Sequence, residues 1–583
     1  MITPRPLNSM MRPSARLRTA QMSARPASDV MAPAEMGSAR PTRHSFARSF
    51  TRTAAWEQWT VIRESFDVDR DGKGVAIYRV EAGTYTMRFI GFCTVIAENK
   101  RTDRVIAESW DVTAALVEDE ITPERLAALG REVPLQEGGR ADASTLIWTR
   151  ANRSARFFDY VVDQLAAGHQ PSLDVIGDTG YLMRSTAFYG NGKWGLADFD
   201  HYEPEHPLAL PYRAQMLCAW LLRELSYDLV EHCARSQSAD AVQLDGPWRR
   251  YFGLGNATGL GMVPYVINHP HVLDAWAASR ELPLAYALRQ DSDPQSPAAE
   301  RLVRLLERAR THLAERAELS TDPYPAYPVI AEGLGPIVDA ATEYQRSGAI
   351  DGNQVEAIGA ALHELAAGAG VEVRQVVDSV LVETYDELDD EVEQLLLCDE
   401  TSLPTLAQSC ETLLERLKTD YDWVLETDFN DPDSAHYFWY SSADNQEPRR
   451  GVRGVTPGED VEHPIDIARA TRGLIDDLEQ FSGQASIAEF LMYHPWHRGS
   501  VDRVQTLAGT RYGEARVNLL AKDFLPLDLQ RFQLAVYGME NYSPQSTDWL
   551  RVSLFGGAPR ASDIAAGIDG DWLFNLKPRG EAS

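Results

Sequence analysis

This chain of 583 residues contains few cysteines and no long apolar run. Its five cysteines are an odd number and form no CxxC pair; they are Cys93, Cys218, Cys233, Cys398 and Cys410. This spacing excludes a disulfide framework and a thiolate metal site, and it favours a reducing compartment. No apolar run reaches the about 18 residues that a membrane helix needs. We therefore expect a soluble, cytoplasmic protein with no membrane partner.

Positive charge is also scarce. The chain has 56 Lys and Arg residues against 86 Asp and Glu residues, which gives a net charge of -30. The electrostatic field of this negative charge repels the phosphates of nucleic acids, so no nucleic-acid partner is expected unless a local basic patch overrides the net charge. Only six basic residues are Lys, a usage typical of a GC-rich bacterial genome. Oligomeric state does not follow from the composition.

Several signatures of common enzymes are absent. The sequence contains no GxxxxGK[ST], no HExxH and no GxSxG motif, which disfavours a P-loop NTPase, a zincin and an ordinary α/β-hydrolase. The segment DVDRDG at 67 to 72 imitates the first half of an EF-hand loop. Tyr78 stands where that loop needs a bidentate Glu, so the segment predicts a hairpin turn.

Residues 1 to 52 form an Arg-rich leader. They contain nine Arg, no Lys and only two acidic residues, Asp29 and Glu35. The segment has no apolar core of a secretory signal. We interpret it as a disordered tail or a start codon placed too early, with an organelle transit peptide as the alternative.

The periodicity of apolar residues then predicts an α+β fold in three parts. Residues 53 to 148 alternate with period two and predict an antiparallel β-meander. Residues 149 to 420 carry helical spacing and predict a mainly helical domain with glycine-rich loops. Residues 421 to 583 are mixed α/β, with a helix near 465 to 481 and strand-like segments at 533 to 539 and 549 to 557.

A glycine-rich stretch at 253 to 271 is the first candidate site. Close approach of backbone to an anionic ligand is possible at its glycines, and its polar side chains supply donors. The candidate ligand-binding residues are Gly253, Gly255, Asn256, Thr258, Gly259, Gly261, Asn268 and His271. The alternative is a glycine-rich turn that permits close helix packing.

A second glycine-rich segment, at 188 to 206, carries polar side chains suited to chemistry. Lys193 lies between glycines and is a candidate anion contact or general base, beside Tyr189 as a ligand contact. Asp198 and Asp200 share one face of an extended segment, and with His201 they could ligate a divalent cation. The alternative is a polar β-turn with solvated acids.

Four histidines precede proline, which restricts the backbone that carries each imidazole. They are His206, His269, His463 and His494. The stretch YHPWHR adds His497 and Arg498 close to His494, so these residues are candidates for acid–base work or for a metal. Helix termination before proline explains the same pattern without a function.

Together these features favour an enzyme that acts on a small anionic metabolite bearing a carboxylate or phosphate. In this hypothesis the 253 to 261 loop holds the anion and Lys193 assists, while His269, Asp198 or Asp200 transfers protons. The cofactor is unknown, with a divalent metal as one possibility. The alternative is a non-catalytic binding or assembly protein whose glycine-rich loops are packing turns. Convergence of 189 to 201, 253 to 271 and 493 to 498 in one cleft would favour the enzyme.

Overall fold

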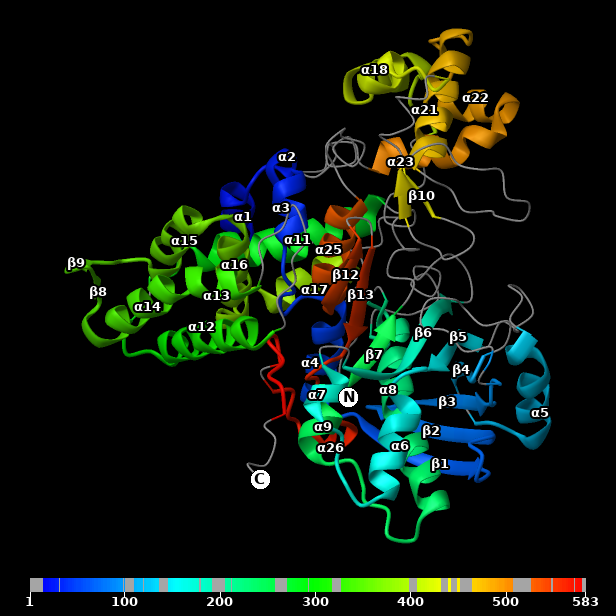
Figure 1. The fold of residues 1–583 in the computed structure, drawn as a ribbon. Helices are drawn as coiled ribbons and strands as arrows, with labels where there is room; N and C mark the ends of the chain where they lie inside the picture. The colour runs from blue at the N-terminus through cyan, green and yellow to red at the C-terminus, as the bar shows by residue number, and fades with distance from the viewer. Residues whose placement is uncertain are drawn as a thin grey trace, which may run out of the picture.

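The fold is α+β, as the periodicity predicts (Figure 1). The structure is a computed structural model. It describes residues 14–30, 32–97, 99, 110–118, 120–135, 145–177, 180–190, 205–210, 212–256, 270–291, 293–316, 327–397, 406–430, 439–441, 448–450, 464–506, 526–546, 549–570 and 572–578. A large sheet, a helical bundle beside it and a smaller helical cluster at the top make up the view in Figure 1. Among the described residues, no helix is both long enough and apolar enough to cross a membrane.

The large sheet has nine strands in the order β1-β2-β3-β4-β5-β6-β7-β13-β12. They are β1 (Thr60–Val68), β2 (Gly74–Ala82), β3 (Tyr85–Cys93), β4 (Val112–Glu118), β5 (Thr145–Arg153), β6 (Tyr181–Gly190), β7 (Gly253–Asn256), β12 (Met539–Ser546) and β13 (Trp549–Leu554). Strands β1 to β4 form the predicted antiparallel meander. The sheet is not confined to residues 53 to 148, because β5, β6, β7 and the β12–β13 hairpin complete it.

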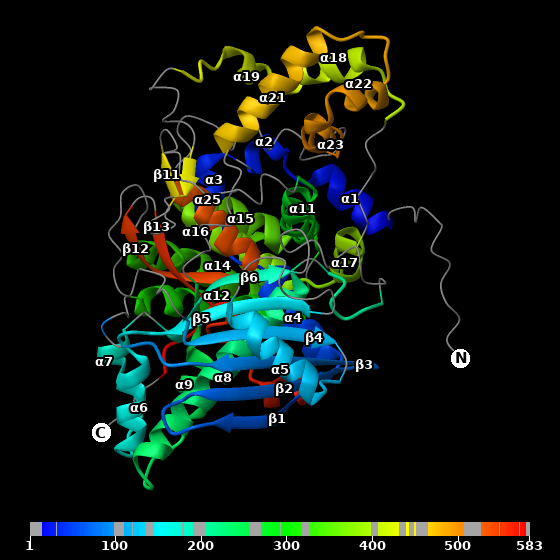
Figure 2. The ribbon, with the colours of Figure 1, turned by 90° about the vertical axis from the view of Figure 1, so that its right-hand side faces the viewer.

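Both faces of the sheet are covered (Figure 2). Alternation along β3 sends Phe89 into the main core beneath α8 (Arg213–Gln237) and Ile90 into a smaller core beneath α5 (Pro123–Glu132). The helix α8 is buried along most of its length and contacts β3, β5, β6 and β7. Gly91 permits this approach, since a Cβ there would lie 2.9 Å from a methyl group of Leu225.

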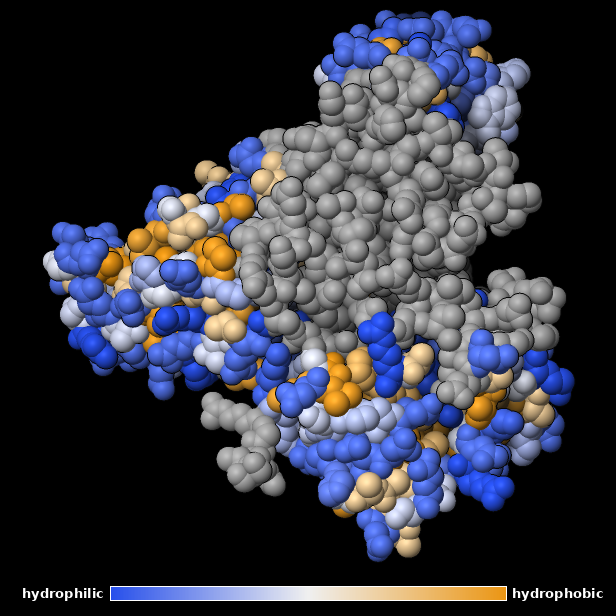
Figure 3. All heavy atoms as spheres, viewed as in Figure 1, coloured by the Kyte–Doolittle hydropathy of each residue, from blue (hydrophilic) through white to orange (hydrophobic). Residues whose placement is uncertain are grey.

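A second core lies in the helical bundle, which is seen at the left of Figures 1 and 3. It comprises α12 (Pro297–Glu315), α13 (Tyr327–Gly333), α14 (Gly335–Ser347), α15 (Ile358–Ala369) and α16 (Val371–Thr384). The side chain of Ser296 accepts the N–H of Ala299 and Pro297 begins α12, which is a favourable combination at the start of a helix. Figure 3 shows hydrophobic residues gathered on the bundle's visible face, within a mostly hydrophilic surface.

The remaining helices connect these parts or form the cluster at the top. They are α6 (Phe158–Ala166), α7 (Leu173–Ile176), α9 (Gly246–Tyr251), α11 (Pro270–Ala287), α17 (Asp389–Leu397), α18 (Cys410–Asp420), α19 (Asp422–Glu426), α21 (Pro464–Glu479), α22 (Ile487–Tyr493), α23 (Arg498–Thr506), α25 (Pro526–Tyr537) and α26 (Ala561–Ala565). The strand-like interpretation of 533 to 539 is wrong, because residues 533 to 537 end α25. A short apolar run satisfies either period, and packing decides between them.

The prediction of disorder in the leader is wrong for its described residues. They form α1 (Ala15–Ser23), α2 (Ala27–Val30), α3 (Pro33–Ser38) and the start of α4 (Phe46–Trp56). The apolar face of α4 contributes Phe46 and Phe50 to the main core. Four arginines of this segment pair with acidic residues that lie more than 200 positions away in the chain; they are Arg25, Arg40, Arg43 and Arg48. Composition alone suggests a tail because it contains no information about such distant partners.

Glu383 on α16 is one of two acidic partners that are only 1% exposed; the other is Glu281. Its carboxylate pairs with Arg48 of α4 and, at 3.4 Å, with Arg301 of α12. The guanidinium carbon of Arg48 also lies 5.1 Å from the ring centroid of Trp572. This ion pair therefore joins α4 to the helical bundle and to the C-terminal segment.

Asp389 at the start of α17 is a second such partner. It pairs with Arg43 and Arg52, and one of its oxygens lies 3.2 Å from His44 Nε2. Burial opposes ionisation of this carboxyl, but the hydrogen bond with His44 and the neighbouring charges hold its pKa far below the ordinary value. The carboxylate is thus ionised and paired in the folded protein.

We predict that Arg48→Met destabilises the protein much more than Arg16→Met. The Arg48 side chain is 2% exposed, so its loss leaves the buried Glu383 without its closest partner. Breaking a buried pair typically costs about 3–5 kcal/mol. Arg16, at 53% exposure, also pairs with an acidic residue, Glu391, and its replacement should cost less than about 1 kcal/mol. Chemical denaturation measures both values, and equal small losses would contradict the network's role.

We also predict that folding stability falls as the pH drops below about 4, in part through Asp389. Because its folded pKa is lowered, the unfolded chain takes up the proton first. The stabilisation is present above the unfolded pKa and is lost as the pH falls towards the folded pKa. Urea unfolding between pH 6 and pH 3 should show a shallower loss in Asp389→Asn than in the wild type. The exposed Asp240→Asn is the control and should keep the wild-type slope.

Candidate metal centre

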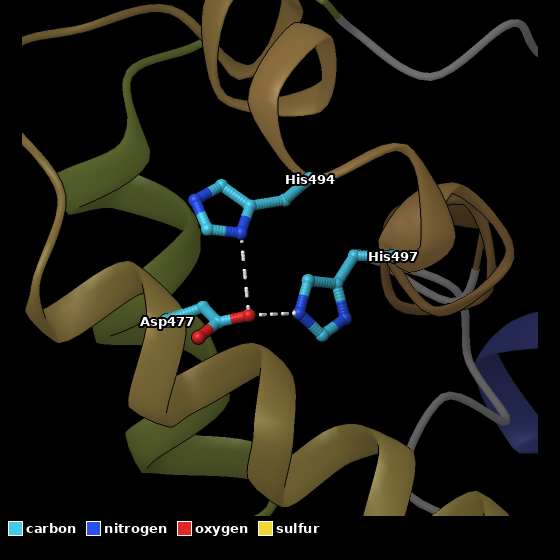
Figure 4. Close-up of side chains that lie close together, drawn as sticks. All are labelled: Asp477, His494 and His497. Carbon is cyan, nitrogen blue, oxygen red and sulfur yellow. Dashed lines mark hydrogen bonds and ion pairs between the residues drawn. The ribbon is translucent and has the colours of Figure 1, made fainter.

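Three side chains of the top helical cluster converge in Figure 4. They are Asp477 from α21, His494 from the end of α22 and His497 from the short 3-10 helix η4 (Pro495–His497). Asp477 Oδ2 lies 3.3 Å from His494 Nδ1 and 2.8 Å from His497 Nε2. Within the described residues, this is the one group of three or more His, Cys, Asp or Glu side chains whose ligand atoms lie within 4.8 Å of one another.

The His–Pro sequence explains how both histidines reach one carboxylate. Helix α22 starts at the N-cap Ser486 and ends at Tyr493, since Pro495 has no N–H to continue it. His494 N–H donates to the carbonyl of Phe490 at 2.9 Å, and His497 N–H donates to the carbonyl of His494 at 3.1 Å. Helix termination before proline is therefore real, and it also turns both imidazoles towards α21.

The cluster lies at the rim of a small hydrophobic core. Phe490 belongs to that core and stacks with both imidazoles, with ring centroids 4.7 Å from His494 and 5.8 Å from His497. The exposed fractions of the side chains are 7% for His497, 23% for His494 and 33% for Asp477. One side of the group is thus dry and the other side meets solvent.

Hydrogen bonding keeps the carboxylate ready to act as a ligand. The hydrogen bond from His497, followed by the nearby imidazoles, lowers the pKa of Asp477. His494 Nδ1 is buried and makes no hydrogen bond within the described part of the chain, although it faces the carboxylate. The lone pair of this nitrogen could therefore bind a metal ion.

Two imidazole nitrogens and one carboxylate oxygen are donors that Zn²⁺ and Fe²⁺ accept. Tetrahedral ligands about 2.0–2.2 Å from a metal lie about 3.4 Å from one another. The separation of 3.3 Å between Asp477 and His494 is close to this value, whereas the 2.8 Å between Asp477 and His497 is the length of a hydrogen bond and would have to lengthen around a metal. Without a metal, the same atoms form a hydrogen bond and an ion pair that join η4 to α21.

Gly253 and Gly255 lie in strand β7 rather than in the predicted loop, because β6 and β13 pair with this segment on both sides. A Cβ on Gly253 would lie 2.5 Å from the carbonyl oxygen of Leu554. A Cβ on Gly255 would lie 2.8 Å from the ring of Tyr181. Close packing is enough to require glycine at both positions, and contact with a ligand stays a prediction.

The other predicted site residues fall into three groups. Arg498 is exposed at the start of α23 and makes no ion pair within the described chain. Backbone alone is described for Tyr189 in β6, Asn256 in β7 and His271 in α11. Outside the described residues lie Lys193, Asp198, Asp200, His201, Thr258, Gly259, Gly261, Asn268 and His269.

The described elements that carry the predicted segments are neighbours. Strands β6 and β7 are parallel and are connected through α8 and α9. Their carboxyl ends, where the two glycine-rich segments continue, therefore lie at the same edge of the sheet. Helix α11, which follows the second segment, contacts α23, which follows His497.

Sequence reasoning missed Asp477. It lies 17 positions before His494, next to Asp476, in a helix with several acidic residues. Asp476 pairs with Arg472 one helical turn earlier, whereas Asp477 faces the histidines. No spacing in the sequence distinguishes these two acids, because the packing of α21 against η4 decides which one meets the histidines.

In comparisons with family models, curated proteins and solved structures, nothing matches this chain. The geometry of the described residues therefore carries the functional argument alone.

We predict that Gly255→Ala destabilises the protein by about 1–3 kcal/mol, the usual range for overpacking. The new methyl group would press on the base of the buried Tyr181 ring, which has little room to move. Gly368→Ala in α15 is the matched control, because nothing lies within 4 Å of its Cβ position. It should be neutral or stabilising by up to about 1 kcal/mol. Thermal or urea unfolding of both variants tests this; similar stability in both would contradict the packing role.

Proposed function

We propose that this protein is a metal-dependent enzyme that acts on a small anionic metabolite bearing a carboxylate or phosphate. A divalent transition-metal ion would bind to Asp477, His494 and His497. The convergence of these three donors at a rigid His–Pro turn is the observation that carries the proposal.

The number and exposure of the ligands support a reactive centre over a purely structural one. Structural zinc sites normally use four protein ligands, whereas catalytic sites keep one position for water or substrate. Here the described part of the chain supplies three ligands, and Asp477 and His494 are partly exposed. An ion held in this way polarises a bound oxygen and lowers the pKa of bound water.

Two features favour an anionic metabolite. An oxygen of a carboxylate or phosphate suits the open position of a divalent ion, and the unpaired Arg498 directly follows His497. In addition, the glycine-rich segments leave the sheet at the carboxyl ends of the parallel strands β6 and β7. Ligands commonly bind at such strand ends in α/β proteins. Two hypotheses from the sequence stay predictions. One is proton transfer by Lys193, His269, Asp198 or Asp200, and the other is a metal ion bound to Asp198, Asp200 and His201.

The second candidate is a non-catalytic binding or assembly protein. The packing contacts of Gly253 and Gly255 favour it, since they explain these glycines without a ligand. So do the large exposed side chains of Met492, Tyr493 and Trp496, which surround the histidines in sequence. In this case the contacts of Asp477 with the two histidines would serve only to hold η4 against α21.

Metal analysis of the full-length protein separates these candidates. After loading with Zn²⁺ or Co²⁺ and desalting, we expect about one ion per chain and a raised melting temperature. At a free metal concentration 100 times the dissociation constant, binding would raise the free energy of unfolding by about 2.7 kcal/mol. Asp477→Asn should lose the ion. Asp476→Asn is the matched control, because it changes the neighbouring acid that pairs with Arg472, and it should keep the ion.

An activity screen then tests the enzymatic part. Metal-loaded wild-type protein should deplete an anionic compound from a metabolite mixture, while Asp477→Asn should leave the mixture unchanged. Wild-type protein that takes up no Zn²⁺, Co²⁺, Mn²⁺ or Fe²⁺ would reject the metal centre. An intact metal centre with no depletion would favour the binding protein.

A further inference from the structure

A cavity of about 560 Å³ lies at the other end of the molecule from the Asp477 cluster. The turn between β1 and β2, the end of β5, and helices α6 and α8 line it. In Figures 1 and 2, which are related by a turn about the vertical, β1 and α6 lie near the bottom and α21 to α23 near the top. This cavity is therefore separate from the candidate metal centre.

Arg153 is a buried cation at this cavity. Its Nη2 donates to the carbonyl of Gly72 at 3.1 Å, and its guanidinium carbon lies 4.6 Å from the ring centroid of Phe158. Among the described residues, its Nε has no hydrogen-bond partner and no carboxylate forms an ion pair with its guanidinium. A buried charge without a counter-charge is unfavourable by several kcal/mol. An anion in the cavity would supply that counter-charge.

The β1–β2 turn places two more cations at the cavity, Arg70 and Lys73. The Asp69 carboxylate accepts the N–H groups of Asp71 and Lys73 at 2.9 Å each, which holds the turn in shape. The Lys73 ammonium makes no ion pair within the described chain, and Arg70 meets only Asp71, at 3.8 Å.

The cavity is much less acidic than the chain as a whole. Three cations and two acidic residues, Asp71 and Asp159, line it, and the Asp69 carboxylate lies in the same turn as Lys73, so these charges balance in a chain of net charge -30. The cavity thus repels anions less than the rest of the molecule does.

One wall of the cavity is apolar. Phe158 and Val162 of α6 are buried there, with Val95 at the edge. Burial raises the pKa of the neighbouring Cys233 thiol, which stays neutral at physiological pH. A ligand that fits this wall has an apolar body as well as its anionic group.

We infer that this cavity binds a small organic anion, a carboxylate or phosphate monoester with an apolar body. Its anionic group lies between Arg153 and Lys73, and its body packs against Phe158 and Val162. This inference goes beyond the proposed function and does not depend on the metal centre.

The test uses the full-length protein and four probes: phenyl phosphate, benzoate, inorganic phosphate and benzyl alcohol. Calorimetry should show saturable binding of phenyl phosphate or benzoate that is tighter than that of inorganic phosphate, and no binding of benzyl alcohol. The tighter of the two aromatic anions identifies the anionic group as phosphate or carboxylate. Binding should be the same in chelator-treated protein and in Asp477→Asn, so a failure of the metal proposal leaves this result intact.

Three variants locate the binding site. Arg153→Met should weaken binding of the aromatic anion at least tenfold and leave the melting temperature equal or higher, because it removes an unpaired buried charge. Lys73→Met should weaken binding about three- to tenfold, and its exposed position keeps the fold intact. Arg156→Met is the matched control, since this exposed arginine lies outside the cavity and its loss should not change affinity.

Two outcomes would overturn the inference. One is the absence of saturable binding of either aromatic anion to the wild type at millimolar concentration. The other is unchanged affinity in Lys73→Met, which stays folded even if Arg153→Met does not.

Discussion

The buried ion pairs between N-terminal arginines and distant carboxylates are the interaction on which the rest of the structure depends. Arg48 shows this best, because its helix α4 places apolar residues in the core beneath the sheet while its guanidinium pairs with Glu383 in the helical bundle. Arg40 pairs with Glu372 on the same α16, and Arg25 pairs with Glu281 on α11. Loss of one partner would strand a buried charge, so these pairs hold the two cores in one arrangement.

The same principle of charge compensation identifies the two candidate sites. At the metal centre, Asp477 faces two imidazoles, and a cation could share all three donors. At the cavity near β1, no carboxylate of the described residues forms an ion pair with the buried guanidinium of Arg153, and an anion could bind to it. The two sites lie at opposite ends of the molecule and need opposite charges (Figures 1 and 2). They are therefore separate proposals, which metal analysis and anion binding test independently.

Local features were predictable because a few neighbouring residues decide them. The period-two pattern located β1 to β4, the DVDRDG turn joined two of these strands, and Ser296 capped α12. The two histidines of YHPWHR were identified as candidates because proline constrains their backbone. Asp477 was not identified, since its role depends on how α21 packs against η4. Likewise, Gly255 suggested a ligand loop, whereas the ring of Tyr181 on the neighbouring strand explains its lack of a side chain.

The sequence by itself determined the α+β class, the first four strands and the excess of negative charge, because these follow from composition and short-range periodicity. Only the tertiary structure determined that the Arg-rich leader folds into helices, that the sheet extends to β12 and β13, and which groups meet at each site. The reason is the range of the interactions: Arg48 and Glu383 are 335 positions apart, and their attraction is felt only once the chain has folded. A pattern read within a short window contains no information about such a partner.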